Sequence, residues 1–239
     1  MKPILRRKKV YLARKDIENL SCFYYIDSNS LLATAFSNFP LPLKRHCVQV
    51  GTVAGLMAKY VPSSAIPENM TLDAYANAVR YGSLYHDMGA YLAFNQRKMY
   101  PSAGERFLRK EIDTRDVSPA ALKIMLETVR YCGERYDGSG YPDKLAGEDI
   151  PLHAEICAIA NTIDECMSVW RGMVVPAAAE TKLNIVHGRG IDFSPEAVEC
   201  FTAAYADINL MYKRWRKVPP FWKNSDIKPL DRSIEQVIG

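Results

Sequence analysis

Apolar side chains recur every three or four positions along most of this chain, the spacing that places them on one face of an α-helix. The pattern predicts helices over approximately residues 43–60, 71–86, 118–135, 151–168 and 176–189 and from 194 onward, with one or two short helices between 17 and 39. No segment shows the convincing alternation of apolar and polar residues that is typical of a β-strand. The pattern therefore predicts an all-α protein.

Two of the predicted helices carry a histidine on the apolar face. His46 shares its face with Val50, Val53, Met57 and Tyr60. His86 ends a second face that contains Leu72, Ala76, Val79 and Ser83, and Asp87 follows it. A single core histidine usually makes a structural hydrogen bond, whereas an adjacent His-Asp pair offers a nitrogen and a carboxylate to iron or manganese. His153, in the first turn of a later helix, is predicted to be exposed.

Composition narrows the class of protein. The 239 residues are 48% hydrophobic and 24% charged, which is enough to bury the core of one domain. The net charge of +4 is too small to make a polyanion the obligatory partner, although it suits an anionic nucleotide. The six cysteines are scattered without a C-x-x-C pair, as expected for thiols in a reducing cytosol. No apolar run reaches the roughly 18 residues of a membrane span, so we expect a cytoplasmic protein without a membrane partner.

A glycine- and proline-rich segment supplies the most specific motif. It reads Asp-Gly-Ser-Gly-Tyr-Pro from Asp137 to Pro142, and its glycines and proline specify a defined loop shape. Together with His86-Asp87 upstream, the segment resembles the signature of the HD-GYP domains. These are metal-dependent phosphodiesterases of the HD superfamily that linearise and degrade cyclic di-GMP.

The resemblance implies a fold and a domain organisation. The expected fold is an HD-type helical bundle over residues 41–210 of a bacterial signalling protein. We expect an N-terminal helical extension over residues 1–40 and a basic, aromatic C-terminal tail over residues 211–239 that packs on or beside the core.

The resemblance also implies a metal site that departs from the family pattern. His46, His86 and Asp87 match retained ligands, with Asp87 as the catalytic residue if the protein is active. Asn161 stands where the family has its last metal-binding aspartate, and Asp164 matches an acidic residue that supports the site by hydrogen bonding. The substituted ligand positions are Tyr100, Cys132 and Gly133. A neutral amide oxygen binds a divalent ion less tightly than a carboxylate, so we expect one Fe or Mn ion, or none if the site is fully degenerate.

Three functions are compatible with these residues. The substitutions favour a cyclic di-GMP signalling protein with impaired or lost phosphodiesterase activity, which binds a cyclic dinucleotide or a signalling protein and could form a homodimer. The alternative is a phosphodiesterase or phosphohydrolase that uses a reduced, one-metal site. The third is a nucleic-acid-binding protein that uses the basic, aromatic tail, although a cationic helix end that packs its tryptophans on the core is the commoner arrangement. Its contacts would come from Lys213, Arg214, Arg216, Lys217, Trp222 and Lys223.

The glycine loop has two interpretations of its own. It could form a recognition surface for the ligand or partner, or it could serve only to end one helix and direct the next. The residues of this predicted recognition loop are Arg135, Asp137, Gly138, Gly140, Tyr141 and Pro142.

Overall fold

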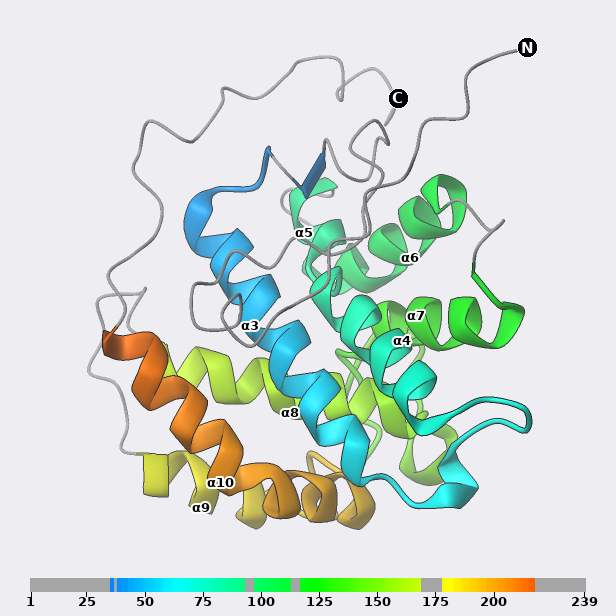
Figure 1. Ribbon diagram of the computed structural model, residues 1–239. Helices are drawn as coiled ribbons and strands as arrows, with labels where there is room; N and C mark the ends of the chain where they lie inside the picture. The colour runs from blue at the N-terminus through cyan, green and yellow to red at the C-terminus, as the bar shows by residue number, and fades with distance from the viewer. Residues whose placement is uncertain (1–34, 37, 93–96, 113–116, 169–177, 218–239) are drawn as a thin grey trace.

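The computed structural model describes residues 35–36, 38–92, 97–112, 117–168 and 178–217, which form a bundle of α-helices (Figure 1). The helices labelled there are α3 (Leu41–Met57), α4 (Leu72–Leu84), α5 (Met88–Leu92), α6 (Tyr100–Glu111), α7 (Pro119–Tyr131), α8 (Leu152–Met167), α9 (Ala178–His187) and α10 (Pro195–Lys217). No β-strand occurs within these ranges, so the all-α prediction is confirmed. Most of the predicted N-terminal extension, and the tail beyond residue 217, lie outside the described residues.

Side-chain caps confirm two of the predicted helix starts. At the start of α4, the Oγ1 atom of Thr71 accepts a hydrogen bond from the backbone N–H of Ala74 at 3.2 Å. At the start of α7, the Oγ atom of Ser118 accepts one from Ala121 at 3.2 Å. Helix α7 ends at Tyr131, earlier than predicted, because the chain turns there into the glycine-rich loop.

Helix α8 lies at the centre of the bundle. Residues 154–160 are all buried, so over nearly two turns this helix has no solvent-facing side. It contacts α3, α7, α9 and α10, and Figure 1 shows α3 crossing in front of it. The full burial of Ile156, Ile159 and Ile163 confirms the predicted apolar face. The polar residues of α8 on the sides that face α3 and α10 are therefore held inside the protein.

Helices α3 and α4 pack at close range because α3 presents a glycine at the contact. A Cβ atom added to Gly51 would lie 3.0 Å from the backbone oxygen of Arg80 in α4, so a larger residue would separate the two helices. The close packing brings the end of α4 toward the first half of α3. As a result, the rings of His46 and His86 lie with their centroids 5.2 Å apart.

The structure corrects the predicted solvent exposure of three residues. Tyr60 is 43% exposed because α3 ends at Met57 and the 3-10 turn that follows points the ring outward. Leu72 is 39% exposed because it is the first residue of α4. The side chain of His153, which was predicted to be exposed, is only 12% exposed. Its Nε2 atom lies 3.2 Å from the Oε2 atom of Glu127, because α7 packs against this side of α8.

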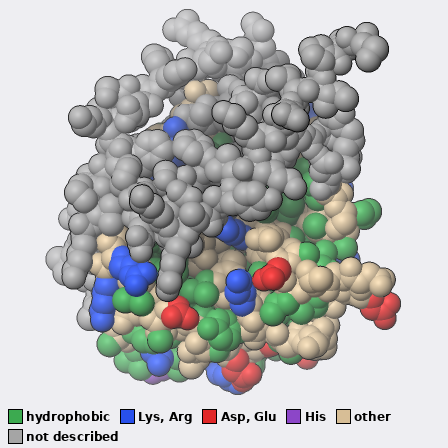
Figure 2. All heavy atoms as spheres, viewed as in Figure 1, with side chains coloured by type: hydrophobic (Ala, Val, Ile, Leu, Met, Phe, Trp, Pro, Cys, Tyr) green, Lys and Arg blue, Asp and Glu red, His purple; other side chains and the backbone are tan. Residues whose placement is uncertain are grey.

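The described surface mixes charges of both signs. Figure 2 shows basic and acidic side chains interspersed with hydrophobic ones on the coloured part of this face. Some of the surface charges pair directly, as where Arg189 lies 2.7 Å from Glu199. This mixture agrees with the small net charge of the chain. Among the described helices, none combines the length and apolar character required to cross a bilayer.

Candidate metal centre

Three residues from neighbouring elements converge at one point. His46 lies in α3, His86 in the turn after α4, and Asp87 directly before α5, and their potential ligand atoms lie within 4.8 Å of one another. The Nε2 atoms of both histidines are 3.6 Å from the Oδ2 atom of Asp87. The histidine side chains are 3% exposed and that of Asp87 is 33% exposed, so solvent reaches the group through the carboxylate.

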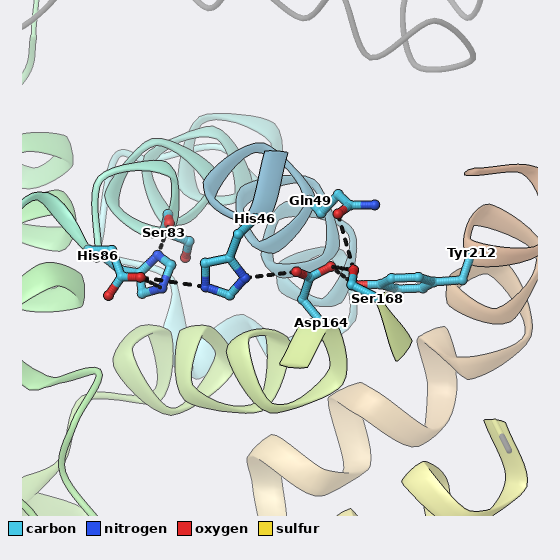
Figure 3. Close-up of polar contacts among 8 residues, drawn as sticks. His46, Gln49, Ser83, His86, Asp164, Ser168 and Tyr212 are labelled. Carbon is cyan, nitrogen blue, oxygen red and sulfur yellow. Dashed lines mark hydrogen bonds and ion pairs between the residues drawn. The ribbon is translucent and has the colours of Figure 1, made fainter. Parts of the chain in front are cut away.

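Hydrogen bonds fix the tautomers of both histidines. The Nδ1 atom of His46 lies 2.8 Å from the Oδ2 atom of Asp164, and the Nδ1 atom of His86 lies 2.8 Å from the carbonyl oxygen of Ser83 (Figure 3). A carboxylate and a carbonyl oxygen only accept, so each ring carries its proton on Nδ1 and donates it. In the neutral ring the lone pair is therefore on Nε2, and both Nε2 atoms lie 3.6 Å from the Oδ2 atom of Asp87. This is the arrangement of a metal-binding histidine with an outer partner.

Asp164 is the centre of a buried network behind His46. It is fully buried, and its Oδ1 atom accepts from the hydroxyl groups of Ser168 and Tyr212, each at 2.7 Å. Figure 3 shows His46 between His86 and Asp164, with Tyr212 reaching the carboxylate from the far side. The expected hydrogen-bonding role of Asp164 is thus observed. The part taken by Tyr212 was not foreseen, because the sequence places this residue on the apolar face of α10.

Unpaired acceptor atoms make the group suited to a cation. The Nε2 atom of His86 and the Oδ1 atom of Asn161 are buried without a hydrogen-bond partner among the described residues. Burial by itself lowers the pKa of His86, but the negative charge of Asp87 is the largest of several effects that together raise it overall. Positive charge is therefore favoured where these acceptors meet. The donor types present fit a divalent metal ion.

The substituted positions contribute less to this group. Tyr100 is the first residue of α6 and is half-buried. Cys132 directly follows α7 as its C-cap residue, and its thiol donates to the carbonyl oxygen of Val129 at a sulfur–oxygen distance of 3.4 Å. A hydrogen bond with Cys157 and burial raise the pKa of Cys132 well above its ordinary value, which disfavours the thiolate that metals bind. Gly133 has no side chain to offer.

The glycine loop is held by a dense set of internal contacts. A Cβ atom added to Gly140 would lie 2.3 Å from the backbone nitrogen of Arg135, so the loop closes on itself only with glycine there. The peptide bond between Tyr141 and Pro142 is cis. Gly138, with a φ of +79°, occupies the left-handed region that glycine favours.

The same loop is attached to the segment between α9 and α10. The guanidinium group of Arg135 lies 5.6 Å from the ring centroid of Phe193 and 3.6 Å from Asp192. The backbone N–H of Asp137 donates to the carbonyl oxygen of Ile191 at 2.9 Å. The exposed Asp137 carboxylate accepts hydrogen bonds within its own turn, which lowers its pKa. These contacts give Arg135 and Asp137 structural roles, and a role in ligand recognition stays a prediction.

A match to a protein-family model shows which family this chain belongs to. The model described as an HD domain matches residues 64–185, more than half of the chain. This chain belongs to the HD domain family. His86, Asp87 and Asn161 lie within the matched residues of this HD domain, and His46 precedes them.

Relatives and a solved structure agree with this assignment. A probable cyclic di-GMP phosphodiesterase of Vibrio cholerae serotype O1 is 31% identical over 110 residues, which cover 45% of this chain and 24% of that protein. A cyclic di-GMP phosphodiesterase of Thermotoga maritima is 25% identical over 227 residues, which cover 87% of this chain and 58% of that protein. The crystal structure of a cyclic GMP-AMP specific phosphodiesterase of V. cholerae matches the fold with a TM-score of 0.50 and 14% identity, over 87% of this chain and 56% of that one. This chain therefore spans less than two thirds of the length of each of these proteins.

Proposed function

We propose that this HD domain acts in cyclic dinucleotide signalling by binding a cyclic dinucleotide beside a single divalent cation, with phosphodiesterase activity impaired or lost. The observation that carries the proposal is the convergence of His46, His86 and Asp87 at a site where the other family ligand positions are substituted. The names of the relatives, which include enzymes for cyclic di-GMP and for 3'3'-cGAMP, support the class of ligand.

The retained residues account for one ion. The two histidine Nε2 atoms and the Asp87 carboxylate would hold it, with the Asn161 amide oxygen as a neutral fourth ligand. Nitrogen donors combined with oxygen donors suit Fe²⁺ or Mn²⁺. When bound, such an ion supplies a Lewis acid for a phosphate oxygen. The protein contributes the orientation, because both rings are held through Nδ1.

The substitutions support weak or absent hydrolysis. A two-metal site holds its ions about 3.5–4 Å apart. Together the ions activate the attacking water and stabilise the leaving oxygen of the phosphodiester. At the positions that would serve the second ion, the chain offers the Tyr100 phenol, the Cys132 thiol and no side chain at Gly133. The phenol and the thiol must each lose a proton before they bind a metal well.

Hydrolysis by a one-metal site is the second candidate. The intact group of His46, His86 and Asp87 favours it, since a third of the Asp87 side chain is open to solvent and could meet a substrate. In this alternative Asp87 is the catalytic residue. Turnover of the cyclic dinucleotide separates the two candidates.

Other predicted partners stay predictions. A signalling protein, a homodimer and ligand recognition by the glycine loop are compatible with the described surface. In the predicted nucleic-acid-binding tail, Lys213 and Arg214 are exposed on α10. The side chains of Arg216 and Lys217, and all of Trp222 and Lys223, lie outside what the structure describes.

The test uses the full chain, stripped with a chelator and reloaded with Fe²⁺ or Mn²⁺ under anaerobic conditions. Bound metal is counted by mass spectrometry, and binding and linearisation of cyclic di-GMP and 3'3'-cGAMP are measured in parallel. The site variant is His86→Ala. The matched control is His187→Ala, because His187 is exposed at the end of α9.

The proposal expects about one ion per chain, loss of that ion in His86→Ala, retention in His187→Ala, and dinucleotide binding with little linear product. Sustained linearisation with one ion would establish the one-metal enzyme instead. Two ions per chain, or equal metal binding in both variants, would refute the proposed site.

A further inference from the structure

We propose that Tyr212 is a positioning residue of the metal centre, and that its hydroxyl group holds Asp164 in the orientation that fixes His46. The inference rests on the proposed function, because it concerns the same site. Tyr212 lies on α10, 48 positions after Asp164, and Figure 3 shows it on the opposite side of that carboxylate from His46. It acts through the carboxylate that His46 contacts.

The two carboxylate oxygens of Asp164 accept hydrogen bonds from different residues. Asp164 is fully buried, so both oxygens need donors inside the protein. Its Oδ2 atom accepts from the Nδ1 atom of His46 at 2.8 Å. Its Oδ1 atom accepts from Tyr212 at 2.7 Å, on the side of α10. Tyr212 thus fixes one end of a rigid carboxylate whose other end orients the histidine.

Ser168 is the second hydrogen-bond donor to the Oδ1 atom of Asp164, but it is less effective in fixing that carboxylate. Its hydroxyl group carries one hydrogen but faces two acceptors, the Oδ1 atom of Asp164 at 2.7 Å and the Oε1 atom of Gln49 at 3.2 Å. A hydrogen given to Gln49 is not available to Asp164. Tyr212 donates to the same Oδ1 atom at 2.7 Å, so the orientation of Asp164 does not rest on Ser168 alone.

Tyr212 itself has little freedom to move. Its side chain is 1% exposed, and its ring makes an edge-on contact with Trp215 at a centroid distance of 4.9 Å. The other end of α10 is tied to α8, because Glu155 accepts a hydrogen bond from the backbone N–H of Ser194 at 2.8 Å. Helix α10 also contacts α3, the helix that carries His46. The donor hydroxyl is therefore held in place by packing on several sides.

Loss of the Tyr212 hydroxyl group should leave the orientation of His46 less fixed, without opening a cavity in the core. Tyr212→Phe keeps the ring. The Oδ1 atom of Asp164 is then left with the Ser168 hydroxyl group, whose one hydrogen can also go to Gln49. Outer partners of metal-bound histidines typically contribute 10- to 100-fold in metal affinity. Since one of two donors to Oδ1 is removed, we expect a loss of about tenfold, at the lower end of this range.

The test compares Tyr212→Phe with a matched substitution on the same helix. Tyr205→Phe also removes a phenolic hydroxyl group from α10, but that group donates to the carbonyl oxygen of Ala178 at 3.0 Å, away from Asp164. The dissociation constant of Mn²⁺ is measured by calorimetry on the full chain. Separately, the ¹⁵N spectrum of His46 in metal-free protein reports which ring nitrogen carries the proton.

The expected result is a dissociation constant raised about tenfold in Tyr212→Phe, a mixture of His46 tautomers in that variant, and wild-type behaviour in Tyr205→Phe. Wild-type affinity in Tyr212→Phe, or an equal loss in Tyr205→Phe, would overturn the inference. If the wild-type protein binds no Mn²⁺, the proposed function fails, and the spectrum decides this inference alone. In that case an unchanged Nδ1–H tautomer in Tyr212→Phe overturns it, and a mixture supports it.

Discussion

The Nδ1 atom of His46 lies 2.8 Å from the Oδ2 atom of Asp164, a residue 118 positions further along the chain. The contact joins α3 to the central helix α8, and the side chain of Asp164 is fully buried. One carboxylate thus serves both the stability of the bundle and the orientation of a candidate metal ligand. The first prediction follows from this double role.

Asp164→Asn should weaken both properties. A neutral amide cannot accept from His46 and Tyr212 with the strength of a carboxylate, and one of its two ends carries donor hydrogens. We predict a loss of about 2 kcal/mol in the free energy of unfolding, measured with urea, and about tenfold weaker Mn²⁺ binding. Asp149→Asn, at an exposed site, is the control and should change neither. An Asp164→Asn protein as stable as the control would contradict the network.

Asn161→Asp should strengthen metal binding. The Oδ1 atom of Asn161 is a buried acceptor without a hydrogen-bond partner among the described residues, and a carboxylate there would add a negative charge beside His86. Without metal, that charge lies near Asp87 and should lower the melting temperature. With Mn²⁺ the rise in melting temperature should exceed that of the wild type, because ligand stabilisation grows with affinity. Asn184→Asp on the exposed part of α9 should behave as wild type, and an equal rise in both variants would argue against a ligand role for residue 161.

Glu155 should make stability depend on pH. Burial is the main cause that raises its pKa from 4.5 to about 7, against the opposing effect of the hydrogen bonds from Ser194. Because the folded protein holds this proton more tightly than the unfolded chain, the stabilisation is fully present below pH 4.5. It is lost as the pH rises through about 7. The difference corresponds to roughly 3 kcal/mol.

A Gln at position 155 isolates this effect, since it resembles the protonated carboxyl group at every pH. The free energy of unfolding of the wild type, relative to Glu155→Gln, should fall by roughly 3 kcal/mol between pH 4 and pH 8. Urea titrations at several pH values measure it. Parallel pH profiles for the two proteins would show that Glu155 titrates normally.

Gly140→Ala should damage the glycine loop. The new methyl group would lie 2.3 Å from the backbone nitrogen of Arg135 and 2.4 Å from the Cα atom of Glu134, neither of which can move independently of the loop. We predict a loss of at least about 2 kcal/mol in the free energy of unfolding. Ser139→Ala, at the exposed neighbouring position, is the control and should cost well under 1 kcal/mol. Equal stability of the two variants would mean that the loop adapts.

Much of the fold could be predicted because it depends on residues close together in the chain. Helix periodicity and the caps at Thr71 and Ser118 involve neighbours three or four positions apart, so the pattern alone located α4 and α7. The boundaries were less accurate where a helix ends at a loop, as with Tyr60 after α3. The family motif selected His86 and Asp87 for the same local reason, since they are adjacent in the chain.

The sequence by itself thus determined the helical class, most helix positions and the chemical types of the candidate ligands. The family resemblance also predicted that His46 and His86 share one site and that Asp164 supports it by hydrogen bonding. Only the tertiary structure decided that Asp164 contacts His46 at Nδ1 and that α10 reaches the site through Tyr212. It also decided that His153 is largely buried against α7. These relationships join residues tens of positions apart, and helix periodicity places a side chain on a face without saying which other helix covers that face. Packing of the whole bundle makes that choice, because buried polar groups must find their partners on whichever helix lies opposite.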